Sequence, residues 1–157
     1  MPKPESAGIL LYRWRDGRLE VLLAHPGGPF WARRDEGAWT IPKGEVVDGE
    51  APLAAARREF EEETGYSPPG PFVALTAVRQ RSGKRVQAWA SPGDFDPRRL
   101  RSNTFEMEWP PRSGRTAEFP EVDRAAYFSL EEARAKLNPA QTAWLDELPP
   151  KLPVAPR

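Results

Sequence analysis

Proline is the residue that most limits what this chain can fold into. Nineteen of its 157 residues are proline, and a proline inside a helix or a central strand removes a backbone hydrogen-bond donor. We therefore expect short elements joined by rigid loops. Residues 51–64 give the clearest helix: Pro52 suits its first turn, Gly65 stands where a C-terminal cap belongs, and residues 68–71 then break the chain. The residues that share one face of this helix are Leu53, Ala56, Phe60 and Thr64.

Apolar runs on both sides of this helix predict strands. Residues 7–14 and 19–24 are largely apolar and flank an Arg15-Asp16-Gly17 turn, which predicts a hairpin of buried strands. Two C-terminal helices are expected over residues 130–137, behind Ser129 as N-cap, and over residues 139–148. Mixed strands with one central helix and C-terminal helices indicate an α/β layered domain. The other expected strands are at residues 39–41, 72–79, 85–90, 105–109 and 122–128.

Composition narrows the class of protein. The chain has 23 basic and 23 acidic residues, no cysteine and one histidine, which argues against disulfide scaffolds, thiolate zinc sites and multi-histidine metal sites. The length fits a single domain over residues 1–157, with a Pro-rich tail at 149–157 that we expect to be frayed. Because neither a long apolar run nor a secretory signal pattern is visible, we expect a cytoplasmic protein without membrane association. The zero net charge predicts no stable nucleic-acid partner.

The predicted central helix carries an acidic cluster. Glu59, Glu62 and Glu63 have the spacing that places side chains on one helix face. Like charges at this spacing repel one another, which makes chemical sense if a cation lies among them, and carboxylate oxygens suit Mg²⁺, Mn²⁺ or Ca²⁺. Taken alone, a Glu-rich helix face is more often solvated surface balanced by basic neighbours, and Arg57 and Arg58 are present for that role.

The spacing of this cluster from residues around it changes that interpretation. Its fixed positions are Gly44, Glu50, Arg58, Glu59, Glu62, Glu63 and Gly65. At roughly 7% usage per residue type, seven such matches arise by chance about once in 10⁸ start points. The pattern over residues 44–66 matches the Nudix box, with Tyr66 where an aliphatic residue is usual. The chain therefore resembles the Nudix hydrolase family over most of residues 6–148.

The resemblance implies a fold, a reaction and a cofactor. Family members are α/β/α sandwiches around a central mixed β-sheet. They hydrolyse a phosphoanhydride bond in a nucleoside diphosphate linked to another group, and they use Mg²⁺ or Mn²⁺. The metal ligands that the resemblance implies are the side chains of Glu59, Glu62 and Glu63 and the backbone carbonyl of Lys43. The residues that it implies as structural support are Gly44, Glu50, Arg58 and Gly65.

The catalytic carboxylate is less fixed within the family. Glu59 and Glu62 are candidates within the box, and many members also use a glutamate from a later loop. We favour Glu121 for that position because it shortly precedes residues 127–130, Tyr-Phe-Ser-Leu, a stretch that is typical of the family. Glu118 is the alternative. The weaker candidates are Glu106 and Glu108.

Residues 39–44, Trp-Thr-Ile-Pro-Lys-Gly, resemble the segment of family members that act on diadenosine or diphosphoinositol polyphosphates. Because Lys43 can contact an additional phosphate as a point charge, the favoured substrate is a small-molecule (di)nucleoside polyphosphate. Trp31 is the candidate for stacking on a base. The Arg- and Pro-rich segment 91–121 is expected to form a wall that sets specificity. Further candidates for binding the substrate are Arg33, Arg34 and His25, of which His25 also suits a structural position.

Two other functions remain open at this point. The first is a Nudix-fold nucleotide-binding module without catalysis. Such modules usually lack one of the box glutamates, whereas all of them are present here. The second is an RNA 5′-end pyrophosphohydrolase built on the same box. The zero net charge and the absence of a long basic stripe count against it.

Overall fold

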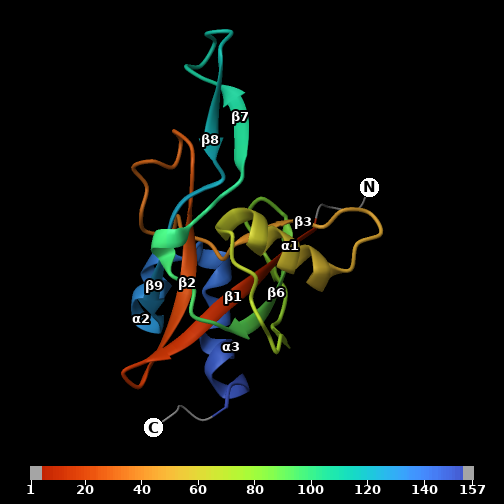
Figure 1. Ribbon diagram of the computed structural model, residues 1–157, viewed down its shortest axis with the longest axis vertical. Helices are drawn as coiled ribbons and strands as arrows, with labels where there is room; N and C mark the ends of the chain where they lie inside the picture. The colour runs from red at the N-terminus through yellow and green to blue at the C-terminus, as the bar shows by residue number, and fades with distance from the viewer. Residues whose placement is uncertain (1–4, 154–157) are drawn as a thin grey trace.

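The computed structural model describes residues 5–153. At its centre is a seven-stranded mixed sheet in which β4, β6, β1, β2 and β9 lie in that order, while β3 pairs with β1 and β5 pairs with β6 (Figure 1). β1 and β6 run parallel, and the other pairs are antiparallel. The strands of this sheet are β1 (Glu5–Arg15), β2 (Arg18–Pro26), β3 (Lys43–Glu45), β4 (Val73–Ala74), β5 (Val78–Arg79), β6 (Arg85–Pro92) and β9 (Val122–Ser129).

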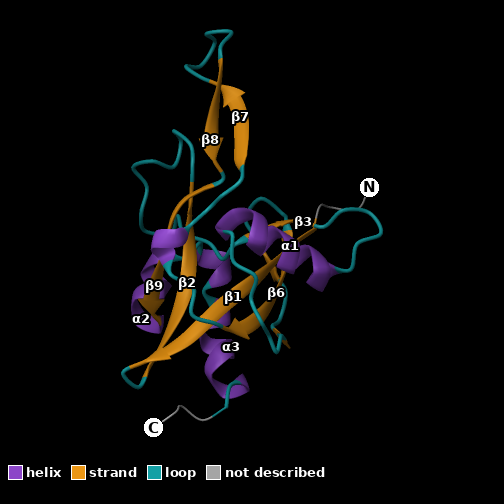
Figure 2. Cartoon of the chain, in the orientation of Figure 1, coloured by secondary structure: helices purple, strands orange, loops and turns teal. Residues whose placement is uncertain are grey.

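Helices cover both faces of this sheet, and their course can be followed in Figure 2. Side chains of β1 alternate between two buried clusters, because successive residues of a strand point to opposite faces. Ile9 packs in the cluster that contains Phe60 of α1, whereas Leu10 packs in the cluster that contains Trp144 of α3. The expected α/β/α sandwich is therefore confirmed. The helices are α1 (Pro52–Thr64), α2 (Leu130–Lys136), α3 (Ala143–Lys151) and the 3₁₀ turns η1 (Pro97–Arg99) and η2 (Pro139–Gln141).

The structure confirms the hairpin of β1 and β2 and corrects the strand predicted at residues 39–41. Those residues form only isolated bridges, to Ala24 on one side and to Leu137 on the other, and β3 begins later, at Lys43. Their backbone pairs with the segment after α2 at one residue and with β2 at the next, so no continuous strand ladder forms. This arrangement places the residues before Lys43 against the link between α2 and η2.

Two further predictions are corrected in the second half of the chain. The strand predicted at residues 72–79 is divided into β4 and β5, because the backbone N–H of Thr76 donates to the Glu147 carboxylate (2.8 Å) and not to β6. The helix predicted over residues 139–148 is instead the 3₁₀ turn η2 followed by α3, which begins at Ala143 and ends at Lys151. Residues 154–157 of the predicted tail lie outside the described residues. Within residues 5–153 no helix is long and apolar enough to cross a membrane.

A second, two-stranded sheet projects from the domain (Figure 1). It consists of β7 (Thr104–Glu108) and β8 (Thr116–Pro120), and we call residues 104–120 the hairpin arm. The sequence predicted β7 but not β8, whose apolar residues alternate with polar ones over only five positions. Phe30, in the loop after β2, packs edge-on against Trp109 with ring centroids 5.8 Å apart. The loop after β2 therefore supports the arm from one side.

Candidate metal and nucleotide site

Three segments that are distant in the sequence meet around a cavity of about 400 Å³. They are β3, α1 and the base of the hairpin arm. Glu121 lies at this base, whereas Glu106 and Glu118 pair across the two strands of the arm and are exposed there. The residues that line the cavity, which we call the acidic pocket, are Lys43, Gly44, Glu45, Glu59, Glu62, Glu63, Asn103 and Glu121. Three of the four glutamates of α1 and the favoured distal glutamate therefore surround one cavity.

The backbone at Gly44 lies directly against the side chain of Glu59. A Cβ atom built on Gly44 would lie 2.0 Å from the Cδ atom of Glu59, far inside van der Waals contact. β3 fixes the position of this backbone, since Gly44 pairs with Ala7 of β1. Space, and not an unusual backbone conformation, therefore requires glycine at position 44.

Arg58 ties the loop before α1 to the helix. Its Nε and Nη2 atoms donate to the two carboxylate oxygens of Glu50 at 2.8 and 3.0 Å, and Nη2 also donates to the carbonyl oxygen of Glu45 at 3.1 Å. Its Nη1 atom donates to Glu59 at 2.8 Å and to Glu62 at 3.2 Å. The hydrogen bonds from Arg58 also hold the pKa of Glu50 below its ordinary value. One guanidinium thus orients both the loop and two carboxylates of the pocket.

Glu63 carries a buried oxygen that nothing satisfies. Its Oε2 atom has no hydrogen-bond partner among the described residues. Burial, followed by the negative charge of Glu59, raises the pKa of Glu63 to about 9. Burial also lowers the pKa of Lys43, an effect to which Lys84 adds. An unpartnered buried carboxylate oxygen is unfavourable, and a cation in the pocket would stabilise it.

A hard divalent cation fits this set of donors. The pocket is lined by carboxylates, with no sulfur or imidazole group, and oxygen ligands are those that Mg²⁺ and Mn²⁺ prefer. Among residues 5–153 no three acidic or imidazole groups converge on one point. Arg58 draws the carboxylates of Glu59 and Glu62 toward itself. Binding of a cation therefore requires those two side chains to exchange part of their contact with Arg58.

Backbone hydrogen bonds position Glu121 at the base of the hairpin arm. The N–H of Asn103 donates to the carbonyl of Glu62 in α1 at 2.8 Å, and the N–H of Glu121 donates to the carbonyl of Asn103 at 2.9 Å. On the other side, the N–H of Gly27 donates to the carbonyl of Glu121 at 2.9 Å. No local sequence pattern indicates Asn103, because its place in the pocket depends on the strand pairing of the arm.

A second cavity, of about 330 Å³, adjoins the acidic pocket at Lys43. We call it the donor pocket. Gln80 and Arg81 come from the turn between β5 and β6, and Asn138 comes from the link between α2 and η2. These three residues were not predicted, since no local pattern brings them together. The residues that line the donor pocket are Pro26, Trp31, Gly37, Ala38, Thr40, Lys43, Gln80, Arg81, Ser82 and Asn138.

Only some of the residues predicted to bind substrate line a pocket. Trp31 and Lys43 line the donor pocket. His25 is fully buried, and its two ring nitrogens lie 2.8 Å from Asp123 Oδ1 and 2.6 Å from the carbonyl oxygen of Arg34. Because neither nitrogen is free, the structure corrects the suggested contact of His25 with phosphate and leaves its structural role. Arg33 lines neither pocket, and the guanidinium of Arg34 lies 5.4 Å from the ring centroid of Trp31.

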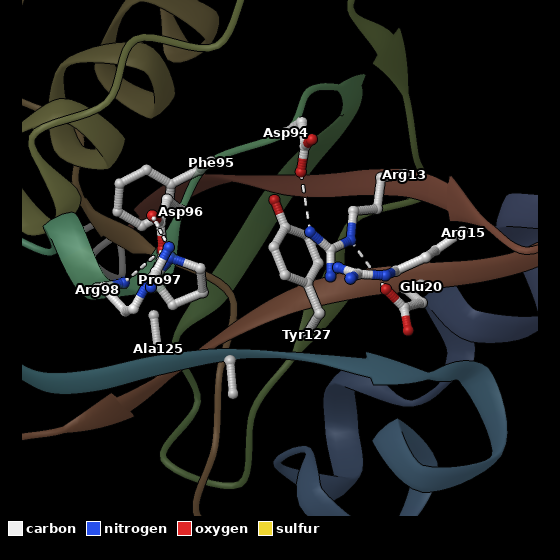
Figure 3. A pocket seen from close by; sticks show the side chains of 11 residues that line it. Arg13, Arg15, Glu20, Asp94, Phe95, Asp96, Pro97, Arg98, Ala125 and Tyr127 are labelled. Carbon is white, nitrogen blue, oxygen red and sulfur yellow. Dashed lines mark hydrogen bonds and ion pairs between the residues drawn. The ribbon is translucent and has the colours of Figure 1, made fainter.

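A third cavity, of about 530 Å³, lies toward the turn between β1 and β2, at the opposite end of β1 from the residues that pair with β3 (Figure 3). The guanidinium carbon of Arg13 stands 3.5 Å from the ring centroid of Tyr127. Arg13 also forms ion pairs of 2.8 Å with both Glu20 and Asp94. The central cation of this cavity is therefore already matched by two carboxylates.

The fold and the acidic pocket together define a class: an α/β/α domain in which a loop and the following helix gather several glutamates, a lysine and a glycine around one cavity. The family model described as NUDIX domain matches residues 2–148. The chain belongs to this family.

Individual relatives are similar over different extents. An RNA pyrophosphohydrolase of Aeromonas hydrophila subsp. hydrophila is 35% identical over 75 residues, which cover 45% of this chain and 43% of that protein. The chain thus spans less than half the length of this curated relative. A crystal structure of C. elegans Ap4A hydrolase in a binary complex has a TM-score of 0.64 at 22% identity, covering 92% of this chain and 93% of that one. The NUDIX domain of Shewanella oneidensis NrtR, complexed with ADP ribose, has a TM-score of 0.62 at 15% identity, covering 94% and 86%.

Proposed function

We propose that the protein is a Mg²⁺- or Mn²⁺-dependent hydrolase that cleaves a phosphoanhydride bond in a nucleoside diphosphate-linked substrate. One observation carries this proposal: the buried, unpartnered oxygen of Glu63 stands among further glutamates in the acidic pocket of a NUDIX domain. A divalent cation would relieve both the repulsion between these carboxylates and the unsatisfied oxygen. The same cation would be attracted by the phosphates of a substrate.

Four glutamates and Lys43 of the acidic pocket have roles in this reaction. A bound divalent cation would neutralise charge on the pyrophosphate and lower the pKa of a water molecule. Glu59, Glu62 and Glu63, with the backbone carbonyl of Lys43, would hold that cation. The ammonium of Lys43 binds a phosphate oxygen as a point charge. Glu121, at the mouth of the pocket, accepts the proton of the attacking water, and Glu59 is the alternative acceptor.

A (di)nucleoside polyphosphate is the substrate that we propose. Lys43 lines both the acidic pocket and the donor pocket, so a phosphate next to the cleaved bond would meet its positive charge. The similar fold of a protein described as an Ap4A hydrolase supports the same class of substrate. Substrates with a short phosphate chain would make less use of Lys43.

The test is hydrolysis of a panel that contains diadenosine polyphosphates, oxidised dGTP, ADP-ribose and diphosphoinositol phosphates, with Mg²⁺, with Mn²⁺ and with EDTA. Glu62→Gln and Glu63→Gln are expected to lower kcat by roughly 100-fold or more. Glu61→Gln is the matched control, because Glu61 is exposed on the same helix and does not line the acidic pocket. Turnover that persists in EDTA, or in both pocket variants, would contradict the proposal.

Removal of pyrophosphate from RNA 5′ ends is a second candidate. It is favoured by the 35% identity to an RNA pyrophosphohydrolase over 75 residues. A 5′-triphosphorylated RNA therefore belongs in the same panel, and a higher kcat/KM for this RNA than for diadenosine tetraphosphate would select the second candidate. The zero net charge predicts weak non-specific binding to an RNA backbone. Binding of nucleotides without any turnover would identify a binding module.

A further inference from the structure

The donor pocket differs from the acidic pocket in charge. No carboxylate lines it, and its two charged residues, Lys43 and Arg81, are cations. The acidic pocket, by contrast, contains five glutamates and only one cation, which is the same Lys43. The two cavities therefore differ in charge and share one lining residue, Lys43.

Buried Gln141 fixes which way the amide of Gln80 points. The Oε1 atom of Gln141 accepts from the backbone N–H of Ile41 at 3.0 Å, so its Nε2 atom must donate. That Nε2 atom donates to Thr40 Oγ1 at 2.8 Å and to Gln80 Oε1 at 3.0 Å. The carbonyl oxygen of Gln80 is therefore occupied, and its amide nitrogen is left to donate to a ligand.

The amide group of Asn138 is also oriented so that its nitrogen can donate to a ligand. Its Oδ1 atom accepts from the backbone N–H of Ala140 at 3.0 Å, which leaves the amide nitrogen as the group available to a ligand. The turn that carries Arg81 is closed by the hydrogen bond from Gln80 N–H to the carbonyl of Lys84 at 2.9 Å. Two amides and two cations on supported backbone thus present donors to one cavity. An acceptor-rich anion is the ligand that this set recognises.

Trp31 adds an apolar surface to these donors. Its side chain is 38% exposed, and the guanidinium of Arg34 lies over one face of its ring, 5.4 Å from the centroid. The opposite face is the one on which a nucleobase would stack. A cavity of about 330 Å³ lies at the lower end of the range for small-molecule sites, so it suits one nucleotide end of a substrate and not two.

Building on the proposed phosphoanhydride hydrolysis, we propose that the donor pocket binds the nucleotide end of the substrate that lies beyond the cleaved bond. Arg81 and Lys43 contact its phosphates, the amides of Gln80 and Asn138 donate to its acceptor atoms, and Trp31 stacks on its base. Arg81 and Trp31 are accordingly specificity-determining residues. They favour substrates that carry both an additional phosphate and an aromatic base.

The test is calorimetric binding of a methylene-bridged, non-hydrolysable analogue of diadenosine tetraphosphate in Mg²⁺, compared with inorganic tetrapolyphosphate. Arg81→Gln is expected to weaken binding of both probes by about tenfold, the effect of one hydrogen bond to a charged group. Trp31→Ala is expected to weaken binding of the analogue by roughly tenfold and to leave tetrapolyphosphate unaffected. Trp31→Phe should restore affinity for the analogue. The matched control is Arg18→Gln, because Arg18 is exposed at the turn between β1 and β2.

Wild-type affinity of both variants for the analogue would overturn the assignment, as would an equal loss of affinity for both probes in Trp31→Ala. Absence of analogue binding by the wild-type protein would overturn it as well. Because the probe is not hydrolysed, the outcome is independent of turnover. A protein that cleaves the panel but ignores both substitutions loses the donor-pocket assignment alone. One that shows the binding pattern without cleavage loses only the proposed hydrolysis.

Discussion

At the scale of single residues, the acidic pocket depends on close contacts around Glu59. The Gly44 backbone lies against its carboxylate, and Arg58 holds that carboxylate from the other side. Neither contact involves an unusual backbone conformation, so both act by restricting where the Glu59 side chain can lie. The position of the Glu59 carboxylate, a metal ligand in our proposal, therefore depends on the absence of a side chain at position 44.

Gly44→Ala tests this restriction. Because the clash falls on the far end of a flexible side chain, we expect Glu59 to move and the stability to change by only about 1 kcal/mol. The rate of metal-dependent hydrolysis is expected to fall at least about tenfold. Thermal melting and kcat measure the two effects separately. In a Glu59→Ala background the glycine substitution should have no further effect on rate, and an additive loss there would contradict the explanation.

At the scale of elements, buried Gln141 joins three segments that are far apart in the chain. Gln141 belongs to η2, and its side chain contacts the residues before β3 and the turn after β5. These contacts fix the side chains of Thr40 and Gln80, which line the donor pocket. They also explain why residues 39–41, which form no strand, are nevertheless held in place.

Gln141→Leu is expected to destabilise the protein by about 1–3 kcal/mol, because it leaves the buried N–H of Ile41 without an acceptor. It should also free the amide of Gln80 to turn. We therefore expect weaker binding of the diadenosine tetraphosphate analogue at temperatures well below the melting point. Chemical denaturation and calorimetry provide the two measurements. An unchanged midpoint of unfolding would show that water replaces the missing acceptor.

The acidic helix could be predicted from the sequence, whereas the lining of the donor pocket and strand β8 could not. The acidic helix and its fixed spacing to Gly44 were predictable, since side chains three and four residues apart must share a helix face. Gln80 and Asn138 were not, because 58 positions separate them, from 80 to 138, and tertiary packing of η2 against the turn after β5 brings them together. Strand β8 was missed because tertiary pairing with β7, and not a long apolar run, makes it a strand.

At the scale of the whole molecule, we expect the acidic pocket to reduce the stability of the folded protein at neutral pH when no cation is bound. Folding buries Glu63 and raises its pKa from 4.5 to about 9. The folded state therefore keeps a proton that the unfolded state releases above pH 4.5. The contribution of Glu63 to stability is fully present below pH 4.5 and is lost as the pH rises toward about 9.

Glu63→Gln should accordingly raise the melting temperature in EDTA at pH 7–8, by roughly 2–4 °C for each kcal/mol relieved. Near pH 4 the variant and the wild-type protein should melt together, since glutamine resembles the protonated carboxyl group. Mg²⁺ should raise the melting temperature of the wild-type protein more than that of the variant. A lower melting temperature of the variant at pH 8 would mean that the Glu63 carboxylate is satisfied in the folded protein.

The hairpin arm pairs with no strand of the central sheet, yet the two residues that bracket it, Asn103 and Glu121, line the acidic pocket. Insertions or deletions at the tip of the arm therefore shift no register in the main sheet and leave both bracketing residues hydrogen-bonded to each other. We therefore expect changes in the length or sequence of the tip to leave the geometry at the base of the arm unaltered. In this sense the arm is a module separate from the strand ladder of the central sheet.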